Sequence, residues 1–211
     1  MFASLLRMTT KYGFSDVRDQ LLKDLKGAYP TGWEDFQAAK VLGEAVFGSP
    51  RPHANAVLNL FEAQNVRFAI PFAAYRASID GFSALISDKP GTVLPRRTLA
   101  TTLRGMYAMR SKVSYAARAV AYGGDLLVCP DKACILNVGI DPVKKRMEVL
   151  WKVYNAIVGK REGGVLTPPP LGHPFCKECT RVIQAAHVQW GSVCWKKLAS
   201  TFGVSDSWDG L

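Results

Sequence analysis

The stretch from Pro95 to Tyr122 decides the fold, and it reads PRRTLATTLRGMYAMRSKVSYAARAVAY. Apolar side chains recur at helical spacing on one side of it, at Leu99, Leu103, Met106 and Val113. Basic side chains recur on another side, at Arg97, Arg104 and Arg118. The pattern therefore predicts one long amphipathic helix over 95–122, which the following glycine pair ends.

Helical patterns continue on both sides of this stretch. Breaker residues separate the preceding segments, which we expect to be helices over 2–12, 16–28, 33–47, 52–65 and from 71 onward. Gly13 ends the first of these, and Ser15 is the expected N-cap of the second. Two more helices are expected after the long one, over 141–158 and 177–200. Because no segment shows a clear strand alternation, the sequence predicts an all-α fold, an irregular array of helices.

The clearest boundary is the breaker run Asp88-Lys-Pro-Gly91. It divides the chain into a helical region over 1–88 and a second helical region over 89–211. The second region contains the long helix and all five cysteines.

Four of the five cysteines fall into two close pairs, Cys129-Pro-Asp-Lys-Ala-Cys134 and Cys176-Lys-Glu-Cys179, separated by 41 residues. A Cys-x4-Cys and a Cys-x2-Cys can close four thiolates around one tetrahedral zinc ion. The second pair also lies at a predicted helix N-terminus, where the helix dipole favours a thiolate. The sequence therefore predicts a structural zinc site in the C-terminal half.

Other states of these cysteines stay open at this point. The pairs could form disulfides, although a reducing compartment and an odd fifth cysteine fit that interpretation poorly. Cys129 and Cys134 could instead be thiols of a surface loop without a metal. His173 lies three residues before Cys176 and could replace one cysteine as a ligand. A catalytic zinc is not expected, because four protein ligands leave no position open for water.

The net charge of +10 is concentrated in one part of the sequence. Residues 89–124 contain seven basic side chains and no acidic one. Such a stretch can neutralise phosphates or bind an acidic partner, with Arg97, Arg104 and Arg118 as the candidate face, but a solvated helix face is the favoured interpretation. The interleaved tyrosines at 107, 115 and 122 have the spacing of a packed helical face. A nucleic-acid or chromatin-associated protein is therefore the alternative function.

Composition and motifs exclude several classes of protein. No apolar run approaches the 18 or so residues of a membrane span. The N-terminus becomes charged too soon for a signal peptide, so we expect a protein of the nucleus or cytoplasm with no membrane partner. No nucleophile elbow, zinc-protease motif or phosphate-binding loop is present, which predicts a non-enzymatic protein. Cys194 is expected in the core, and His187 at the surface or at a helix edge.

Several segments resemble the region that follows the BTB/POZ fold in a large group of fungal BTB-domain proteins. They are Leu5–Leu22 (LLRMTTKYGFSDVRDQLL), Tyr29-Pro30, Ala69–Tyr75 (AIPFAAY), Leu103-Arg-Gly105, the two cysteine pairs and Cys194–Gly203 (CWKKLASTFG). The resemblance covers nearly the whole chain, and each motif taken alone is moderately specific.

The resemblance implies a helical, BACK-like region that acts in protein–protein interaction, in some members as the substrate-binding arm of a cullin-type ubiquitin ligase. The BTB fold that precedes this region in the family has no counterpart in the sequence. BTB-type dimerisation and cullin binding are therefore not expected of this chain alone. The expected function is that of an adaptor module with a structural zinc, whose protein partner the sequence does not name.

Overall fold

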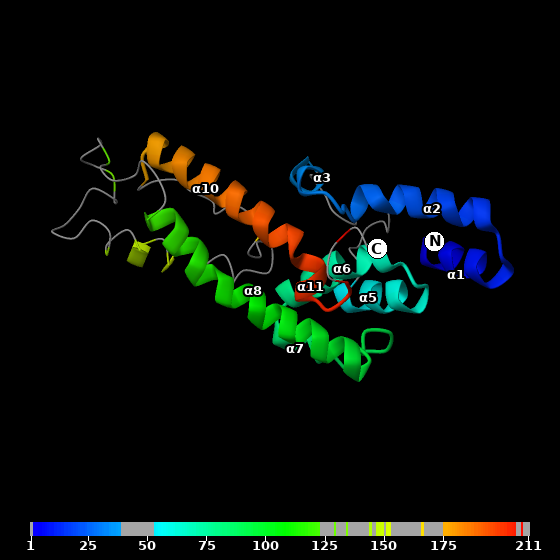
Figure 1. The fold of residues 1–211 in the computed structure, drawn as a ribbon. Coiled ribbons are helices and arrows are strands. Elements are labelled where there is room, and N and C mark those ends of the chain that lie inside the picture. Colours follow the sequence, from blue (N-terminus) through cyan, green and yellow to red (C-terminus); the bar gives the residue numbers. More distant parts are fainter. Residues whose placement is uncertain are drawn as a thin grey trace. The chain divides into compact units, whose positions relative to one another are not determined.

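The regular structure in the described part of the chain is all helical. The structure is a computed structural model that describes residues 2–38, 53–122 and 175–205, with shorter pieces at 129, 134, 144, 147–149, 151–152, 166 and 208; over 113–122 it describes the backbone alone. Every regular element in these ranges is an α-helix or a short 3-10 helix (Figure 1). The predicted all-α class is confirmed.

The described helices range in length from three residues to 27. Their bounds are α1 Phe2–Tyr12, α2 Ser15–Ala28, α3 Trp33–Ala38, α5 Ala54–Ala63, η1 Arg67–Ala69, α6 Ile70–Ile79, α7 Phe82–Leu85, α8 Arg96–Tyr122, α10 Lys177–Lys196 and α11 Leu198–Thr201. Among these described elements, no helix is both long and apolar enough to cross a membrane.

Most of the predicted helices have the expected limits. The long helix is α8, and Gly13 ends α1 in the left-handed conformation, with φ of 70°. The predicted N-cap of α2 is wrong, because Ser15 is the first helical residue and Phe14 caps it without a side-chain hydrogen bond. The expected last helix is broken at Lys197 into α10 and α11. Residues 39–47 and most of 141–158 lie outside the described residues.

The contacts between residues group the chain into two compact units. Unit 1 comprises residues 1–106 together with 196–211, and unit 2 comprises residues 107–195. The sequence-based division at residue 88 stays a prediction. Each unit is described by itself below.

An aromatic cluster forms the centre of unit 1, where α5 and α6 pack on each other. The Tyr29 ring meets Phe61 of α5 edge-on at 4.8 Å and Phe72 of α6 at 5.9 Å. Phe36 of α3 meets Phe72 from another side at 5.6 Å. Since Phe61 and Phe72 are almost fully buried, their rings contribute apolar burial and edge-to-face contacts at once.

Two asparagines of α5 hold the segment between α7 and α8. Asn55 is fully buried, and its amide donates hydrogen bonds to the carbonyls of Ala84 at 2.8 Å and Thr92 at 3.1 Å. One helical turn later, the Asn59 amide donates to the carbonyl of Val93 at 2.8 Å. The bonds to Thr92 and Val93 satisfy backbone carbonyls of the irregular segment between α7 and α8, and the bond to Ala84 satisfies a carbonyl of α7.

A close approach of α8 to the end of the chain completes unit 1. Gly105 lies inside α8, where glycine is unfavourable by roughly 1 kcal/mol relative to alanine. The buried ring of Phe202 occupies the place of the missing side chain, so that a Cβ at Gly105 would lie 2.9 Å from Cγ and closer still to Cδ1 and Cε1. The glycine is therefore required by packing.

Candidate metal centre

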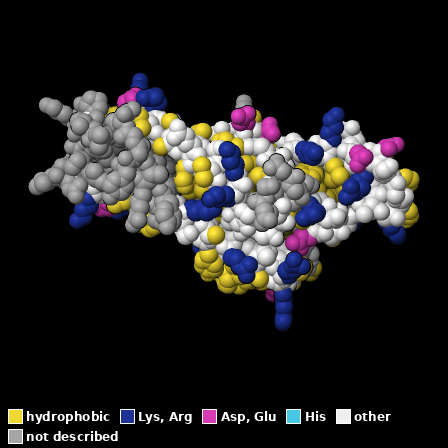
Figure 2. All heavy atoms as spheres, in the orientation of Figure 1, with side chains coloured by type: hydrophobic (Ala, Val, Ile, Leu, Met, Phe, Trp, Pro, Cys, Tyr) yellow, Lys and Arg dark blue, Asp and Glu magenta, His cyan; other side chains and the backbone are white. Residues whose placement is uncertain are grey.

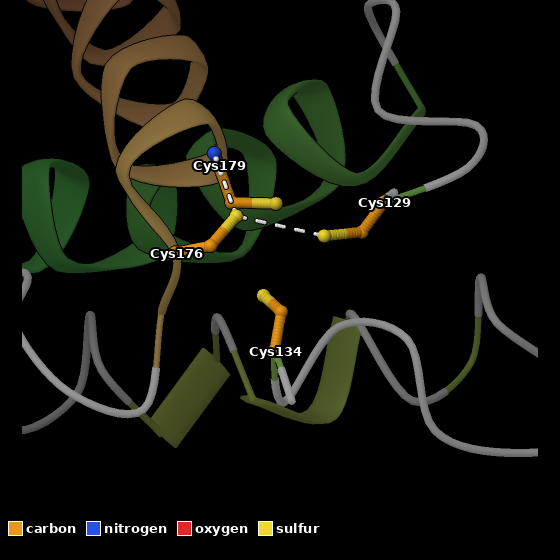
Figure 3. Close-up of side chains that lie close together, drawn as sticks. All are labelled: Cys129, Cys134, Cys176 and Cys179. Carbon is orange, nitrogen blue, oxygen red and sulfur yellow. Dashed lines mark hydrogen bonds between the residues drawn. The ribbon is translucent and has the colours of Figure 1, made fainter. Parts of the chain in front are cut away.

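The four paired cysteines of unit 2 converge on one point. Their sulfur atoms all lie within 4.8 Å of one another, and the Sγ atoms of Cys129 and Cys176 are 3.5 Å apart. Figure 3 shows the four side chains pointing toward a common centre, two of them from the start of α10. The structure thus brings both cysteine pairs together in one cluster.

The distances agree with the requirements of a single tetrahedral ion. Four sulfurs at about 2.3 Å from a central zinc lie about 3.8 Å from one another. The observed separations, from 3.5 Å to at most 4.8 Å, bracket that value. All five cysteines are free, and 3.5 Å is far longer than a disulfide bond of about 2.05 Å. The disulfide alternative therefore does not describe this state of the chain.

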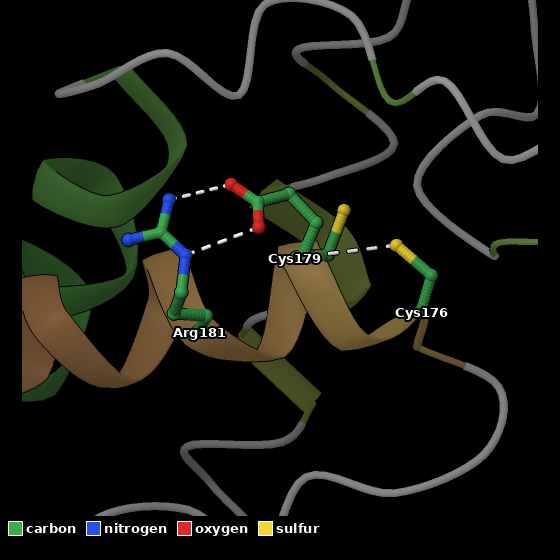
Figure 4. A network of polar contacts seen from close by, with 4 residues as sticks. Cys176, Cys179 and Arg181 are labelled. Carbon is green, nitrogen blue, oxygen red and sulfur yellow. Dashed lines mark hydrogen bonds and ion pairs between the residues drawn. The ribbon is translucent and has the colours of Figure 1, made fainter.

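The start of α10 positions two of the four sulfurs. Cys176 immediately precedes the helix, and its sulfur accepts a hydrogen bond of 3.4 Å from the backbone N–H of Cys179, shown as a dashed line in Figure 4. Its carbonyl accepts the N–H of Thr180 at 2.9 Å. Cys176 thus acts as the N-cap of α10, because its side chain and its carbonyl both satisfy N–H groups of the first turn.

The same local structure shifts the pKa values of Cys176 and Cys179 in opposite directions. The backbone N–H of Cys179 lowers the pKa of Cys176, an effect that burial opposes and that contacts with the other cysteines reinforce. Burial raises the pKa of Cys179, and the neighbouring sulfurs raise it further. In a metal-free cluster, the partly exposed Cys176 is therefore the more acidic of the two thiols. A bound cation would favour the thiolate at both positions, because it supplies the positive charge that burial removes.

The other two sulfurs come from the segment that follows α8. Cys129 is 3% exposed and Cys134 is 1% exposed, as buried as the core residues of either unit. The alternative in which these two are thiols of a surface loop is therefore wrong. The cluster joins two segments that 41 residues separate in the sequence.

Charged side chains near the cluster lie on the outer face of α10. Arg181 forms a two-pronged ion pair with Glu178, which Figure 4 shows beside the first turn. Arg181 lowers the pKa of Glu178 through its hydrogen bonds and its charge. Both side chains are more than half exposed, so the pair contributes little to stability, and it is not a source of metal ligands.

The remaining candidate ligands differ in their positions. Cys194 is 3% exposed and lies 15 residues after Cys179 on the same helix, hence about 22 Å along its axis. Its assignment to the core is confirmed. His173 lies outside the described residues, so its exchange for a cysteine ligand stays a hypothesis.

The expectation for His187 is wrong. The side chain is buried, and one ring nitrogen, Nε2, lies 3.3 Å from the carbonyl oxygen of Leu166. Burial lowers the pKa of His187, an effect that this backbone contact opposes. The physical reason is helical register, because residues 179, 183, 187 and 191 all fall on the buried side of α10.

The candidate basic face is exposed where the structure describes it. Arg97 and Arg104 are exposed on α8, while the side chain of Arg118 lies outside the described residues. Tyr107 is 63% exposed, which contradicts its assignment to a packed face; Tyr115 and Tyr122 have no described side chains. In Figure 2, basic side chains on the visible face are spread out singly, without one continuous patch.

The sequence analysis missed a polar contact in unit 1. The Thr98 hydroxyl of α8 donates a hydrogen bond of 2.5 Å to Oε2 of Glu62 on α5. Thr98 and Thr102 are spaced by one helical turn on the buried side of α8. This spacing is the feature of the sequence that indicates that both threonines face the interior. Their pairing with α5 depends on the tertiary structure.

No family model, curated protein or solved structure matches this chain. Fold and site therefore define its class: an all-α protein with a buried four-cysteine cluster that could hold a metal ion. The resemblance to post-BTB regions stays a prediction.

Proposed function

We propose that this protein is a non-enzymatic protein-interaction module of the nucleus or cytoplasm, in which a structural zinc ion fastens the second half of the chain. The proposal of a metal rests on one observation. Four sulfurs from two segments that are distant in the sequence lie within 4.8 Å of one another. Four thiolates gathered in a buried place would repel one another without a cation between them.

Zinc is the ion that suits this donor set best. A tetrahedral group of four sulfurs is typical of zinc or of iron–sulfur chemistry. The thiolates of a multi-iron cluster bind different iron atoms, and so stand farther apart than ligands of one ion. Four sulfurs that all lie within 4.8 Å of one another therefore favour a single ion. With four protein ligands the coordination sphere is closed, which supports a structural role.

The metal is tested by elemental analysis of the purified full chain. We expect about one zinc per chain, no iron absorption bands, and cysteine pairs that react with a thiol reagent only after a chelator is added. A zinc content below about 0.2 per chain, with four thiols that react freely, would refute the proposal.

An exposed apolar surface on α1 and α2 supports the interaction role. Leu5, Met8 and Tyr12 recur along one face of α1 and are 37%, 51% and 58% exposed. Phe14, whose ring lies 6.3 Å from that of Tyr12, and Val17 in the first turn of α2 are also more than half exposed. We call these five residues the α1–α2 apolar surface. Large apolar side chains gathered in this way are typical of protein-binding sites.

Site-specific crosslinking tests this surface. We expect a photoreactive benzoylphenylalanine at Tyr12 to form a covalent adduct with a defined protein in cells, and a Met8→Glu substitution to reduce the adduct at least about tenfold. The same photoreactive residue at Lys23, an exposed polar position of α2, is the control. Equal crosslinking from both positions, or none from Tyr12, would contradict a binding role for the surface.

A second candidate function rests on α8. The basic side chains at 89, 96, 97, 104 and 110 are all exposed, and no acidic residue lies between 89 and 124. Exposed charge of one sign favours binding to a phosphate backbone. The alternative is therefore a nucleic-acid or chromatin-associated protein that uses the α8 face.

Binding of the chain to duplex DNA at low salt distinguishes the nucleic-acid-binding function from the protein-interaction function. If the alternative holds, a double substitution Arg97→Glu and Arg104→Glu weakens binding and lowers the slope of log K against log salt by about 2. Lys11→Glu with Lys23→Glu changes the net charge equally on α1 and α2, and leaves that slope almost unchanged. Absence of binding by the unmodified chain at about 50 mM salt would eliminate the alternative.

A further inference from the structure

Unit 1 contains a cavity that the proposed function does not use. Its volume is about 400 Å³, and its walls come from α5, α6, the first turns of α8 and the segment that follows α11. All of these elements belong to unit 1. The volume falls within the range of cavities that bind small molecules, roughly 300–1,000 Å³.

The floor of the cavity is apolar and well packed. Leu58 of α5 and Phe202 line it and are at most 2% exposed, and Ile70 of α6 closes one side. The Phe202 ring lies against Gly105, so this wall cannot retreat toward α8 without repacking that helix. A rigid apolar floor suits the hydrocarbon part of a ligand.

The polar groups of the cavity include a half-buried carboxylate, an exposed guanidinium and a buried hydroxyl with an unmet hydrogen bond. Glu62 is half-buried there, and among the described residues no cation forms an ion pair with it. The Thr98 hydroxyl bonds one of its two carboxylate oxygens and thereby orients the group. Thr102 also lines the cavity and is 1% exposed, and its hydroxyl has no hydrogen-bond partner in the described part of the chain.

We propose that this cavity binds a small organic cation, an amine with an apolar body. The ammonium group would pair with Glu62, whose oxygens accept hydrogen bonds and which forms no ion pair within the described part of the chain. The apolar body would cover Leu58 and Phe202, and the wall at Thr102 would supply one more polar contact. A free amine and the lysine side chain of a partner protein both offer this chemistry.

Arg97 lines the same cavity but does not reverse this preference. Its side chain is exposed, whereas Glu62 is half-buried. Solvent and salt screen an exposed guanidinium, while a partly buried carboxylate keeps more of its effect on a bound group. The cavity therefore selects a cation over an anion of the same shape. This inference does not depend on the metal centre of unit 2.

Binding of matched probes to the full chain tests the proposal. The probes are benzylamine, its neutral analogue benzyl alcohol, the anion benzoate, and a lysine blocked at both backbone ends. Amide chemical shifts in NMR titrations report where each one binds. We expect benzylamine to perturb residues of α5 and the start of α8, and to bind at least about tenfold more tightly than benzyl alcohol. Tighter binding of the blocked lysine would identify a partner's side chain as the source.

Two substitutions keep the shape of the site. Glu62→Gln retains the acceptor for Thr98 and removes the charge, so benzylamine affinity should fall about tenfold or more. Thr102→Val should weaken it less. Glu178→Gln removes one carboxylate from α10 in unit 2 and should leave the affinity unchanged. Equal binding of benzylamine and benzoate, no effect of Glu62→Gln, or no binding of any amine at 10 mM or so would overturn the proposal.

Discussion

Cys134→Ser is expected to abolish stoichiometric zinc binding and to loosen the start of α10, although position 134 is distant from that helix in sequence. Cys134 is 1% exposed and contributes one of the four clustered sulfurs. A serine hydroxyl is a poor zinc ligand, so three thiolates would remain to hold the ion. Structural zinc contributes about 10–16 kcal/mol of apparent binding free energy in small domains, and loss of one ligand removes a large part of it.

Elemental analysis and hydrogen exchange measure this result together. Zinc content after dialysis against a chelator should fall from about one per chain to near zero. Amides in the first turn of α10 should exchange faster, because Cys176 then loses the metal that anchors it.

Two variants serve as controls for this prediction. Cys194→Ser changes a buried thiol that lies about 22 Å along α10 from Cys179, so it should lower stability modestly and leave the zinc content intact. His173→Ala should also leave the zinc content intact if all four ligands are cysteines. Full zinc content in Cys134→Ser, or its loss in either control, would contradict the four-cysteine site.

Gly105→Ala is expected to destabilise unit 1, although alanine is the better helix former by roughly 1 kcal/mol. The added Cβ would overlap the buried ring of Phe202, 2.9 Å from its Cγ and closer to two other ring atoms. Phe202 is 2% exposed, and a ring displaced from α8 would lose this packing and enter the unit 1 cavity that it lines. Overpacking of this kind costs about 1–3 kcal/mol, so the net effect is a loss of stability.

A second substitution identifies the cause. Phe202→Leu removes the ring atoms that the new methyl group would meet. We therefore expect the double variant to be more stable than the sum of the two single effects by about 1 kcal/mol or more. Gly27→Ala is the matched control, since nothing lies within 4 Å of a Cβ on this α2 glycine.

Urea denaturation followed by circular dichroism measures all four variants. Gly27→Ala should raise the free energy of unfolding by up to about 1 kcal/mol, and Gly105→Ala should lower it. A stabilising Gly105→Ala, or strictly additive effects in the double variant, would show that the Phe202 contact does not decide the choice of glycine.

The local structure was predicted well from the sequence, because the interactions that determine it act between residues close together in the chain. The spacing of apolar residues over 95–122 identified α8, and Gly13 identified the end of α1. The start of α2 was misplaced by one residue, because a capping residue and a first helical residue differ only in backbone geometry. The helical period that places Ile183 inside also places His187 four residues later on the same buried side, so its burial follows from the sequence pattern.

The sequence by itself determined the helical class, the limits of most helices and the pairing of four cysteines at ligand spacing. Only the tertiary structure decided that the two pairs meet, that Asn55 holds the segment before α8, and that Phe202 fills the space beside Gly105. The physical reason is the range of the interactions. Helical hydrogen bonds and side-chain periodicity act within a few residues, and spacing along the chain records them. Contacts between distant segments depend on how whole helices pack, which no local pattern specifies.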